Sequence, residues 1–181
     1  SEVEEVLKRL RDIARELEKL IEEVIRRDRK LVEELKRRSE RSIETDRRLV
    51  KRLKEMLDGG ADSKDVKRVI ERSRELNDEN TRESERVIEE SERLNRELEE
   101  RIKEVTERLR RLLKELRDRG ADEEKVRRAE EEIREVERRL RKLLRDSKEE
   151  TKEVVKELRR LNEESKKETE KVVREAEKRT K

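Results

Sequence analysis

The stretch "DGGADSKDVKR" at residues 58–68 returns about a third of the chain later as "DRGADEEKVRR" at residues 118–128. Together the two stretches hold the only three glycines, Gly59, Gly60 and Gly120. Glycine readily takes the left-handed conformation that ends a helix, and an aspartate shortly after it caps the free N–H groups of the next helix. Each stretch therefore predicts a helix end, a short loop and a new helix start.

These two loops divide the chain into three nearly equal parts. We expect helices over about residues 2–58, 62–118 and 122–180, with loops at Gly59–Ala61 and Gly120–Ala121. Loops this short make neighbouring helices antiparallel. The sequence thus predicts an all-α, up-down-up bundle of three helices of about 55 residues each, forming a single domain over residues 1–181.

Aliphatic residues form a stripe along each predicted helix, as from Val66 to Leu116 and from Val126 to Ala176. Their average spacing lies between the 3.5-residue period of a left-handed coiled coil and the 3.6-residue period of a straight helix. We therefore expect nearly straight helices with coiled-coil-like packing.

The composition agrees with long helices. Charged residues make up 60% of the chain and hydrophobic residues 28%, which is a balance often typical of disorder. However, the 56 basic and 53 acidic residues nearly cancel, and the aliphatic residues recur with a helical period. Such a composition with this period is typical of long helices and coiled coils.

Several partners are not expected from this composition. Acidic and basic residues are interspersed, also around the basic stretches "KRRSERS" and "RRLRKLLRDSKEE", so no basic face for nucleic acid is evident, and no aromatic residue is available to stack on a base. No apolar run approaches the roughly 20 residues that span a bilayer, and "SEVEEVLKRL" is acidic where a signal peptide is basic. We expect a soluble, untargeted protein, cytoplasmic when expressed recombinantly, whose lack of cysteine fits a reducing compartment or deliberate avoidance of thiols.

Small polar residues interrupt every aliphatic stripe, as in "SRELNDENTRES" at residues 73–84. A buried amide or hydroxyl group costs about 1 to 3 kcal/mol unless it finds a hydrogen-bond partner. The interruptions therefore predict a buried polar network whose members come from all three helices. The predicted members are Asp28, Ser39, Ser42, Thr45, Ser73, Asn77, Asn80, Ser84, Ser91, Asn95, Ser147, Thr151, Asn162, Ser165 and Thr169.

Folding the chain at its glycines aligns these residues into two polar layers. One layer holds Asp28 with Ser91, Asn95, Ser147 and Thr151. The other holds Ser39, Ser42, Thr45, Ser73, Asn77, Asn80, Asn162 and Ser165. Aliphatic stripes alone tolerate a slip of one heptad, whereas a slip would move these polar groups against aliphatic residues. The layers are therefore expected to specify helix register and pairing.

The equal helices, the repeated Gly-Ala-Asp loops and polar segments such as "RSRELNDEN" and "RRLNEESKK" resemble computationally designed helical bundles with buried hydrogen-bond networks. The resemblance implies a structural scaffold without natural biochemical activity. It equally allows a subunit of a designed homo- or hetero-oligomer that accepts further helices. Natural spectrin-like repeats are similar in outline, but they usually carry core aromatic residues and less regular loops.

The alternatives to a scaffold rest on few residues. Without histidine or cysteine, Asp28 is the sharpest catalytic candidate, because burial raises the pKa of a carboxyl group, but we interpret it as a network member. Designed di-iron bundles need inward histidines, so no metal or cofactor is expected. We favour a monomer without a required partner, although a second copy or another designed helical chain could contact the apolar residues beside the stripe. These residues are Ile25, Val32, Ile43, Val50, Leu57 and Val155.

Overall fold

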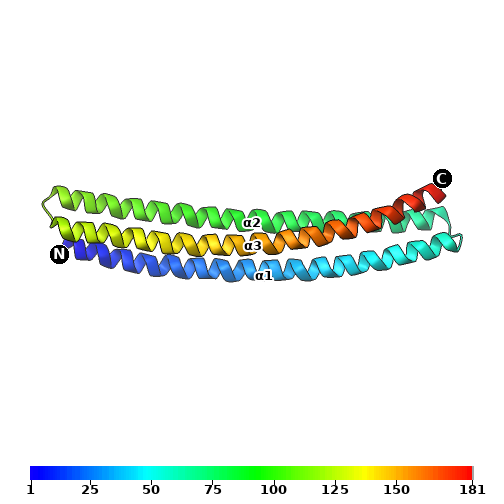
Figure 1. The fold of residues 1–181 in the computed structure, drawn as a ribbon, viewed down its shortest axis with the longest axis horizontal. Coiled ribbons are helices and arrows are strands. Elements are labelled where there is room, and N and C mark those ends of the chain that lie inside the picture. The colour runs from blue at the N-terminus through cyan, green and yellow to red at the C-terminus, as the bar shows by residue number, and fades with distance from the viewer. Residues whose placement is uncertain (181) are drawn as a thin grey trace. The chain divides into compact units, whose positions relative to one another are not determined.

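Three α-helices joined by two short loops make up the described residues, 1–180, of the computed structural model (Figure 1). The helices are α1 (Glu2–Asp58), α2 (Ser63–Asp118) and α3 (Glu123–Arg179). These residues contain no strand, so the predicted all-α class with three long helices is confirmed. Lys181, the last residue of the predicted domain, lies outside the described residues.

Both loops have the same geometry, as their shared sequence predicts. Gly60 and Gly120 have φ angles of 70° and 94°, in the left-handed region that glycine tolerates. The next N–H group, of Ala61 or Ala121, donates a hydrogen bond of 2.9 Å back to a carbonyl oxygen in the last turn of the preceding helix. This is the Schellman pattern of helix termination.

Two aspartates follow these loops and stand just before their helices. The Asp62 carboxylate accepts a hydrogen bond from the N–H group of Lys64, and Asp122 accepts one from that of Glu124, each at 3.4 Å. A capping residue lies outside the helix that it caps. For this reason α2 and α3 each begin one residue later than the predicted starts.

The chain forms two compact units, each built from one segment of every helix. Unit 1 comprises residues 1–29 and 90–150, and unit 2 comprises residues 30–89 and those from 151 onward. The loop between α1 and α2 belongs to unit 2, whereas the loop between α2 and α3 belongs to unit 1. A single domain over residues 1–181 remains a prediction.

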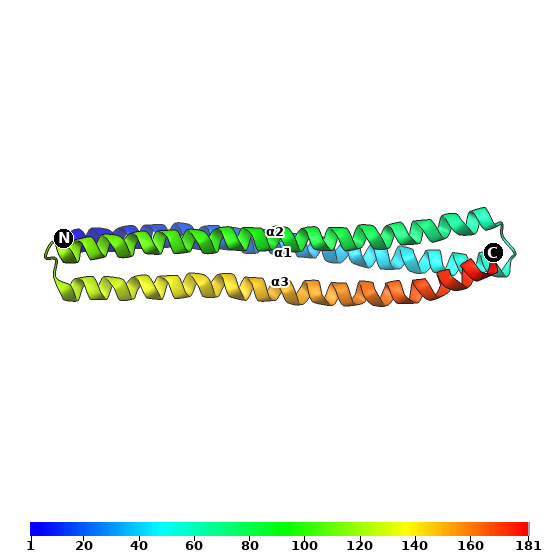
Figure 2. The same ribbon diagram turned by 90° about the horizontal axis from the view of Figure 1, so that it is seen from above.

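Unit 1 has a core of aliphatic residues from all three helices. Val3 at the start of α1 packs in one cluster with Leu113 near the end of α2 and Val126 near the start of α3. Within this unit α2 therefore runs antiparallel to α1 and α3, as Figure 2 also shows. A second cluster contains Ile21, and the half-buried Val136 packs against both clusters.

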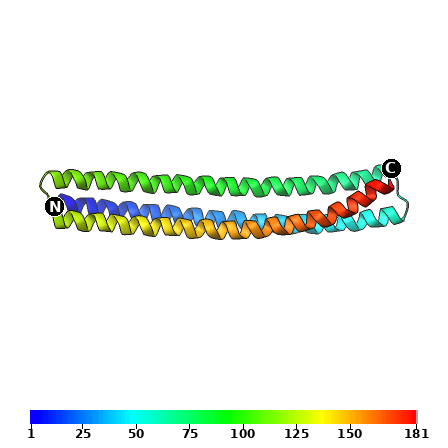
Figure 3. The same ribbon diagram turned by 45° about the horizontal axis from the view of Figure 1, so that its top comes forward.

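Unit 2 has the same antiparallel arrangement but two separate aliphatic clusters. One cluster, near the α1–α2 loop, includes Leu53, Val66 and Val173, one residue from each helix. The other cluster joins Leu35, Val87, Val155, Leu158 and Val32. Figure 3 gives a third view of these segments. Val32 and Val155, which the sequence placed beside the stripe, are thus buried against residues of the same chain.

Candidate functional site: the buried polar layers

Asp46 is the centre of one polar layer in unit 2. Its side chain is only 2% exposed, and its two carboxylate oxygens accept hydrogen bonds from the hydroxyl groups of Ser73 on α2 and Thr169 on α3. The layer therefore links all three helices through a single carboxylate. Both of its oxygen atoms have a hydroxyl donor, which compensates for their removal from water.

The sequence analysis placed Thr45 in this layer and omitted Asp46, and the structure corrects this. Thr45 is exposed, because a helical residue lies about 100° around the axis from its neighbour. The heptad spacing contained the missing signal, since Ser39, Asp46 and Leu53 are seven residues apart and all three are buried. An aspartate among surface charges is easily taken for one of them.

A second layer in unit 2 contains a chain of hydrogen bonds across the three helices. The Ser39 hydroxyl group donates to the Asn80 Oδ1 atom at 3.2 Å, and the Asn80 Nδ2 atom donates to the Asn162 Oδ1 atom at 2.8 Å. Ser39 is buried, whereas both asparagines are half-buried. Asn80 thus uses its acceptor toward α1 and its donor toward α3.

Other predicted residues of unit 2 do not link helices through their side chains. The buried Ser84 donates to the Asn80 carbonyl oxygen of its own helix at 2.9 Å. Within residues 1–180, no side-chain hydrogen bond is found for four half-buried residues. These are Ser42, Asn77, Thr151 and Ser165, although the Ser165 carbonyl oxygen accepts a hydrogen bond from Thr169.

The polar layer of unit 1 is centred on Asp28, which is also 2% exposed. The Ser91 hydroxyl group donates to the Asp28 Oδ2 atom at 3.1 Å, and the Asn95 Nδ2 atom donates to the Ser91 carbonyl oxygen at 2.9 Å. The other oxygen atoms, Asp28 Oδ1 and Asn95 Oδ1, are buried without a hydrogen-bond partner. Ser147 of α3 is buried, but this layer has no side-chain hydrogen bond to it among the described residues.

Ion pairs flank Asp28 on α1. Arg27 pairs with Glu90 of α2, and Arg29 pairs with Glu150 of α3, each at 3.2 Å. Burial raises the pKa of the Asp28 carboxyl group above its ordinary value of 3.8. The Ser91 hydrogen bond and the Arg27 charge lower this pKa and the Glu90 charge raises it, but burial is the largest effect.

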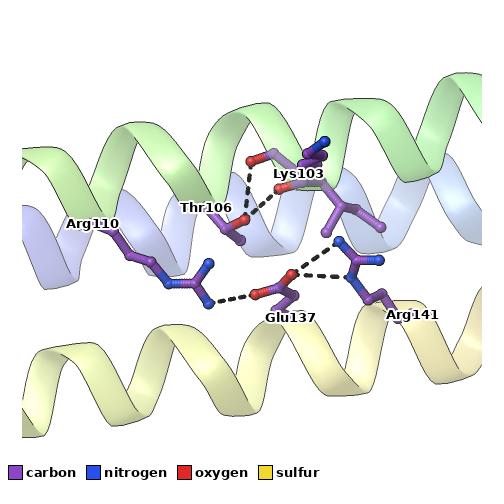
Figure 4. Close-up of polar contacts among 6 residues, drawn as sticks. Lys103, Thr106, Arg110, Glu137 and Arg141 are labelled. Atoms are coloured by element: carbon purple, nitrogen blue, oxygen red, sulfur yellow. Dashed lines mark hydrogen bonds and ion pairs between the residues drawn. The ribbon is translucent and has the colours of Figure 1, made fainter.

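Figure 4 shows two further polar features of unit 1 that the sequence analysis did not single out. Thr106 is buried, and its hydroxyl group donates to the carbonyl oxygens of Ile102 and Lys103 on its own helix. Glu137 of α3 accepts hydrogen bonds from Arg110 of α2 and Arg141 of α3. Glu137, but not Thr106, therefore links two helices.

The sequence contains no histidine or cysteine, and no group of three or more potential metal-ligating side chains is found within residues 1–180. In the same part of the chain, no helix combines the length and apolar character needed to cross a membrane. The chemistry of the polar layers is hydrogen bonding between helices.

Antiparallel helix segments around aliphatic clusters and polar layers define a three-helix bundle in each unit. The chain is similar to a solved structure described as a "Computationally designed three helix bundle", with a TM-score of 0.65 and 20% sequence identity over 99% of this chain and 90% of that one. No family model matches the chain, and no curated protein matches it. The predicted resemblance to designed helical bundles is confirmed at the level of the fold.

Proposed function

We propose that this chain is a designed structural scaffold without enzymatic activity, whose buried polar layers specify helix register and pairing. The hydrogen-bonded chain Ser39–Asn80–Asn162 is the observation that carries the proposal. The likeness to a designed three-helix bundle and the repeated loop sequence support it as well.

The physical basis of register selection is the neighbourhood of Asn80. Val87 lies one heptad after Asn80, and Ser73 lies one heptad before it. A slip of α2 by one heptad toward its own start therefore places the Val87 side chain opposite the Ser39 hydroxyl group, which loses its acceptor. Each buried polar group left without a partner costs about 1 to 3 kcal/mol, whereas aliphatic contacts survive such a slip.

The test replaces the two amides with apolar side chains of similar size. The double variant Asn80→Leu, Asn162→Leu should keep or raise the thermal stability, because apolar burial replaces polar burial. It should lose its unique register, which is measured by the number of amide resonances per residue and by the molar mass in solution. One set of resonances and an unchanged mass would contradict the proposed role.

A matched control uses hydroxyl groups that bind only their own helix. Ser84 and Thr106 are both buried, and each donates to a carbonyl oxygen within four residues. The variant Ser84→Ala, Thr106→Val therefore removes buried polar groups without removing a bond between helices. It should keep a single register, which separates loss of polarity from loss of the inter-helix bonds.

A second candidate function is a subunit that accepts a further helix. Leu161 is the exposed large hydrophobic residue of the described chain, at 37% exposure, and a groove of unit 2 is lined by Ser42, Leu76 and Asn80 with charged residues around them. Light scattering tests this alternative directly. A molar mass near 22.2 kDa favours the scaffold, and a multiple of that mass favours the subunit.

A further inference from the structure

Two side chains that form hydrogen bonds with Ser91 in unit 1 each keep one unpaired oxygen atom. Asp28 contacts the Ser91 hydroxyl group, and Asn95 contacts the carbonyl oxygen of the same residue. In both side chains the remaining oxygen, Oδ1, is buried without a partner. A deprotonated carboxylate and an amide oxygen are both acceptors, so neither can satisfy the other.

Rotating the Asn95 amide by 180° does not solve this problem. Its Nδ2 atom donates to the Ser91 carbonyl oxygen at 2.9 Å. Exchanging the nitrogen and oxygen atoms would place Oδ1 against that carbonyl oxygen, which is also an acceptor. The observed orientation keeps the hydrogen bond to Ser91, and in this orientation the Oδ1 atoms of Asp28 and Asn95 are both left without a donor.

We propose that Asp28 of unit 1 is a proton-binding site, in which a proton from solvent is held on the Oδ1 atom and donated to the Oδ1 atom of Asn95. A single proton then satisfies both unpaired oxygens, and the Ser91 hydroxyl group still donates to Oδ2. No bond between heavy atoms forms or breaks. This site goes beyond the scaffold role and does not depend on it.

The charged groups around the site nearly cancel. Arg27 beside Asp28 on α1 pairs with Glu90 of α2, and Arg29 on α1 pairs with Glu150 of α3. Ser147, the buried residue of α3 nearby in sequence to Glu150, is uncharged. With the neighbouring charges paired, burial of the carboxyl group is what favours the protonated form.

A proton bound at Asp28 makes the free energy of unfolding depend on pH in one direction. Because burial raises the pKa of Asp28 in the folded chain above the ordinary 3.8, the native state binds this proton more tightly than the unfolded state does. The contribution of Asp28 to the free energy of unfolding therefore rises as the pH falls from the raised pKa toward 3.8. Carboxylates whose pKa is lowered by ion pairs act in the opposite direction.

Chemical denaturation of the full chain between neutral pH and about pH 3.5 provides the first test. The variant Asp28→Asn carries a permanent N–H donor toward Asn95, so its denaturation midpoint should lie above that of the original chain at neutral pH. The difference should shrink as the pH falls, because the original chain then acquires its proton. A variant midpoint below the original at neutral pH would overturn the proposal.

Asp46→Asn is the matched control. Asp46 is buried to the same extent, but both of its oxygens already accept from hydroxyl groups. An amide there replaces one acceptor by a donor, so this variant should have a lower denaturation midpoint than the original chain at neutral pH. The two asparagine variants should therefore shift in opposite directions, and equal shifts would contradict the proton site.

Carbon-13 NMR of the aspartate carboxyl groups provides the second test and separates proton sharing from burial alone. Asp28 should titrate above 3.8 in the original chain, and its midpoint should move down in Asn95→Leu, which keeps the site apolar but removes the acceptor. An unchanged midpoint in a folded Asn95→Leu chain would overturn the shared proton. Should this variant not fold, titration of Asp28 at or below 3.8 in the original chain overturns the site.

Discussion

The two buried aspartates are equally hidden from solvent but differ in what surrounds them. Asp46 in unit 2 accepts from Ser73 and Thr169, whereas Asp28 in unit 1 accepts only from Ser91. Consequently one Asp28 oxygen is left without a partner. The comparison teaches that two equally buried carboxylates can differ in how many of their oxygen atoms have a hydrogen-bond donor.

The cores of the two units also differ in how aliphatic clusters and polar layers are arranged. In unit 1 the two aliphatic clusters are joined through Val136, and the buried polar layer is centred on Asp28. In unit 2 the two clusters share no residue, and the Asp46 and Asn80 layers lie between them in sequence. Unit 1 thus depends more on apolar burial, and unit 2 depends more on hydrogen-bond geometry.

Truncating a fully buried leucine in each core gives the largest expected effect. Leu113→Ala in unit 1 and Leu53→Ala in unit 2 should each lower the free energy of unfolding by about 2 to 5 kcal/mol, since both side chains are almost completely buried. We expect the larger loss for Leu113, whose cluster is more extensive. Urea denaturation measures both, and a clearly larger loss for Leu53 would reverse the comparison of the cores.

Removing the Asp46 carboxylate should have the next largest effect. Asp46→Ala leaves the buried Ser73 hydroxyl group without its acceptor, while Thr169 keeps the Ser165 carbonyl oxygen. The expected loss is about 1 to 3 kcal/mol in the free energy of unfolding. Asp28→Ala should cost less, because it also removes an unpaired buried oxygen; thermal unfolding of both variants checks this order.

Alanine at the left-handed glycines should cost about 1 to 2 kcal/mol in each unit. No atom lies within 4 Å of a Cβ atom added to Gly60 or Gly120, so the cost comes from the backbone conformation alone. Gly60→Ala acts in unit 2 and Gly120→Ala in unit 1, and we expect similar losses of thermal stability. Asparagine tolerates this conformation better, so Gly120→Asn should recover part of the loss.

Neutralising single surface ion pairs should have the smallest effect. Glu137→Gln in unit 1 removes the negative charge and one of the two oxygen atoms that accept from Arg110 and Arg141. It should cost about 1 kcal/mol or less, with the loss shrinking at high salt. Glu157→Gln in unit 2 should leave the denaturation midpoint unchanged. Arg160 lowers the pKa of Glu157, but both side chains are well exposed. A large loss at Glu157 would contradict this ranking.

Much of the fold follows from the sequence, because local chemistry determines it. The glycine–alanine–aspartate repeats predict both loops, and the aliphatic period predicts which helix faces meet. The sequence analysis also selected Asp28, Ser39 and Asn80, which the structure places in bonds between helices. These features depend on spacing along one helix, which a sequence displays directly.

The individual hydrogen bonds could not be predicted from spacing. A serine or threonine on a helix can donate across to a neighbouring helix or back to its own carbonyl oxygen four residues earlier. Ser39 takes the first option, and Ser84 and Thr106 take the second. The choice depends on side-chain rotamers and on how each helix is rotated about its axis. An error of about one residue in this rotation also explains why the sequence analysis selected Thr45 instead of Asp46.

Each unit contains two stretches that are separated in the sequence. This arrangement determines which helix segments can pair first during synthesis on the ribosome. The α1 and α2 segments of unit 2 are continuous in the chain through residue 89, so they can pair as soon as that residue has emerged. The first 29 residues, which belong to unit 1, have to wait for partners beyond residue 89. A nascent chain therefore carries its first aliphatic stripe uncovered for longer than its second, and a chaperone that recognises apolar helices would meet that stripe first.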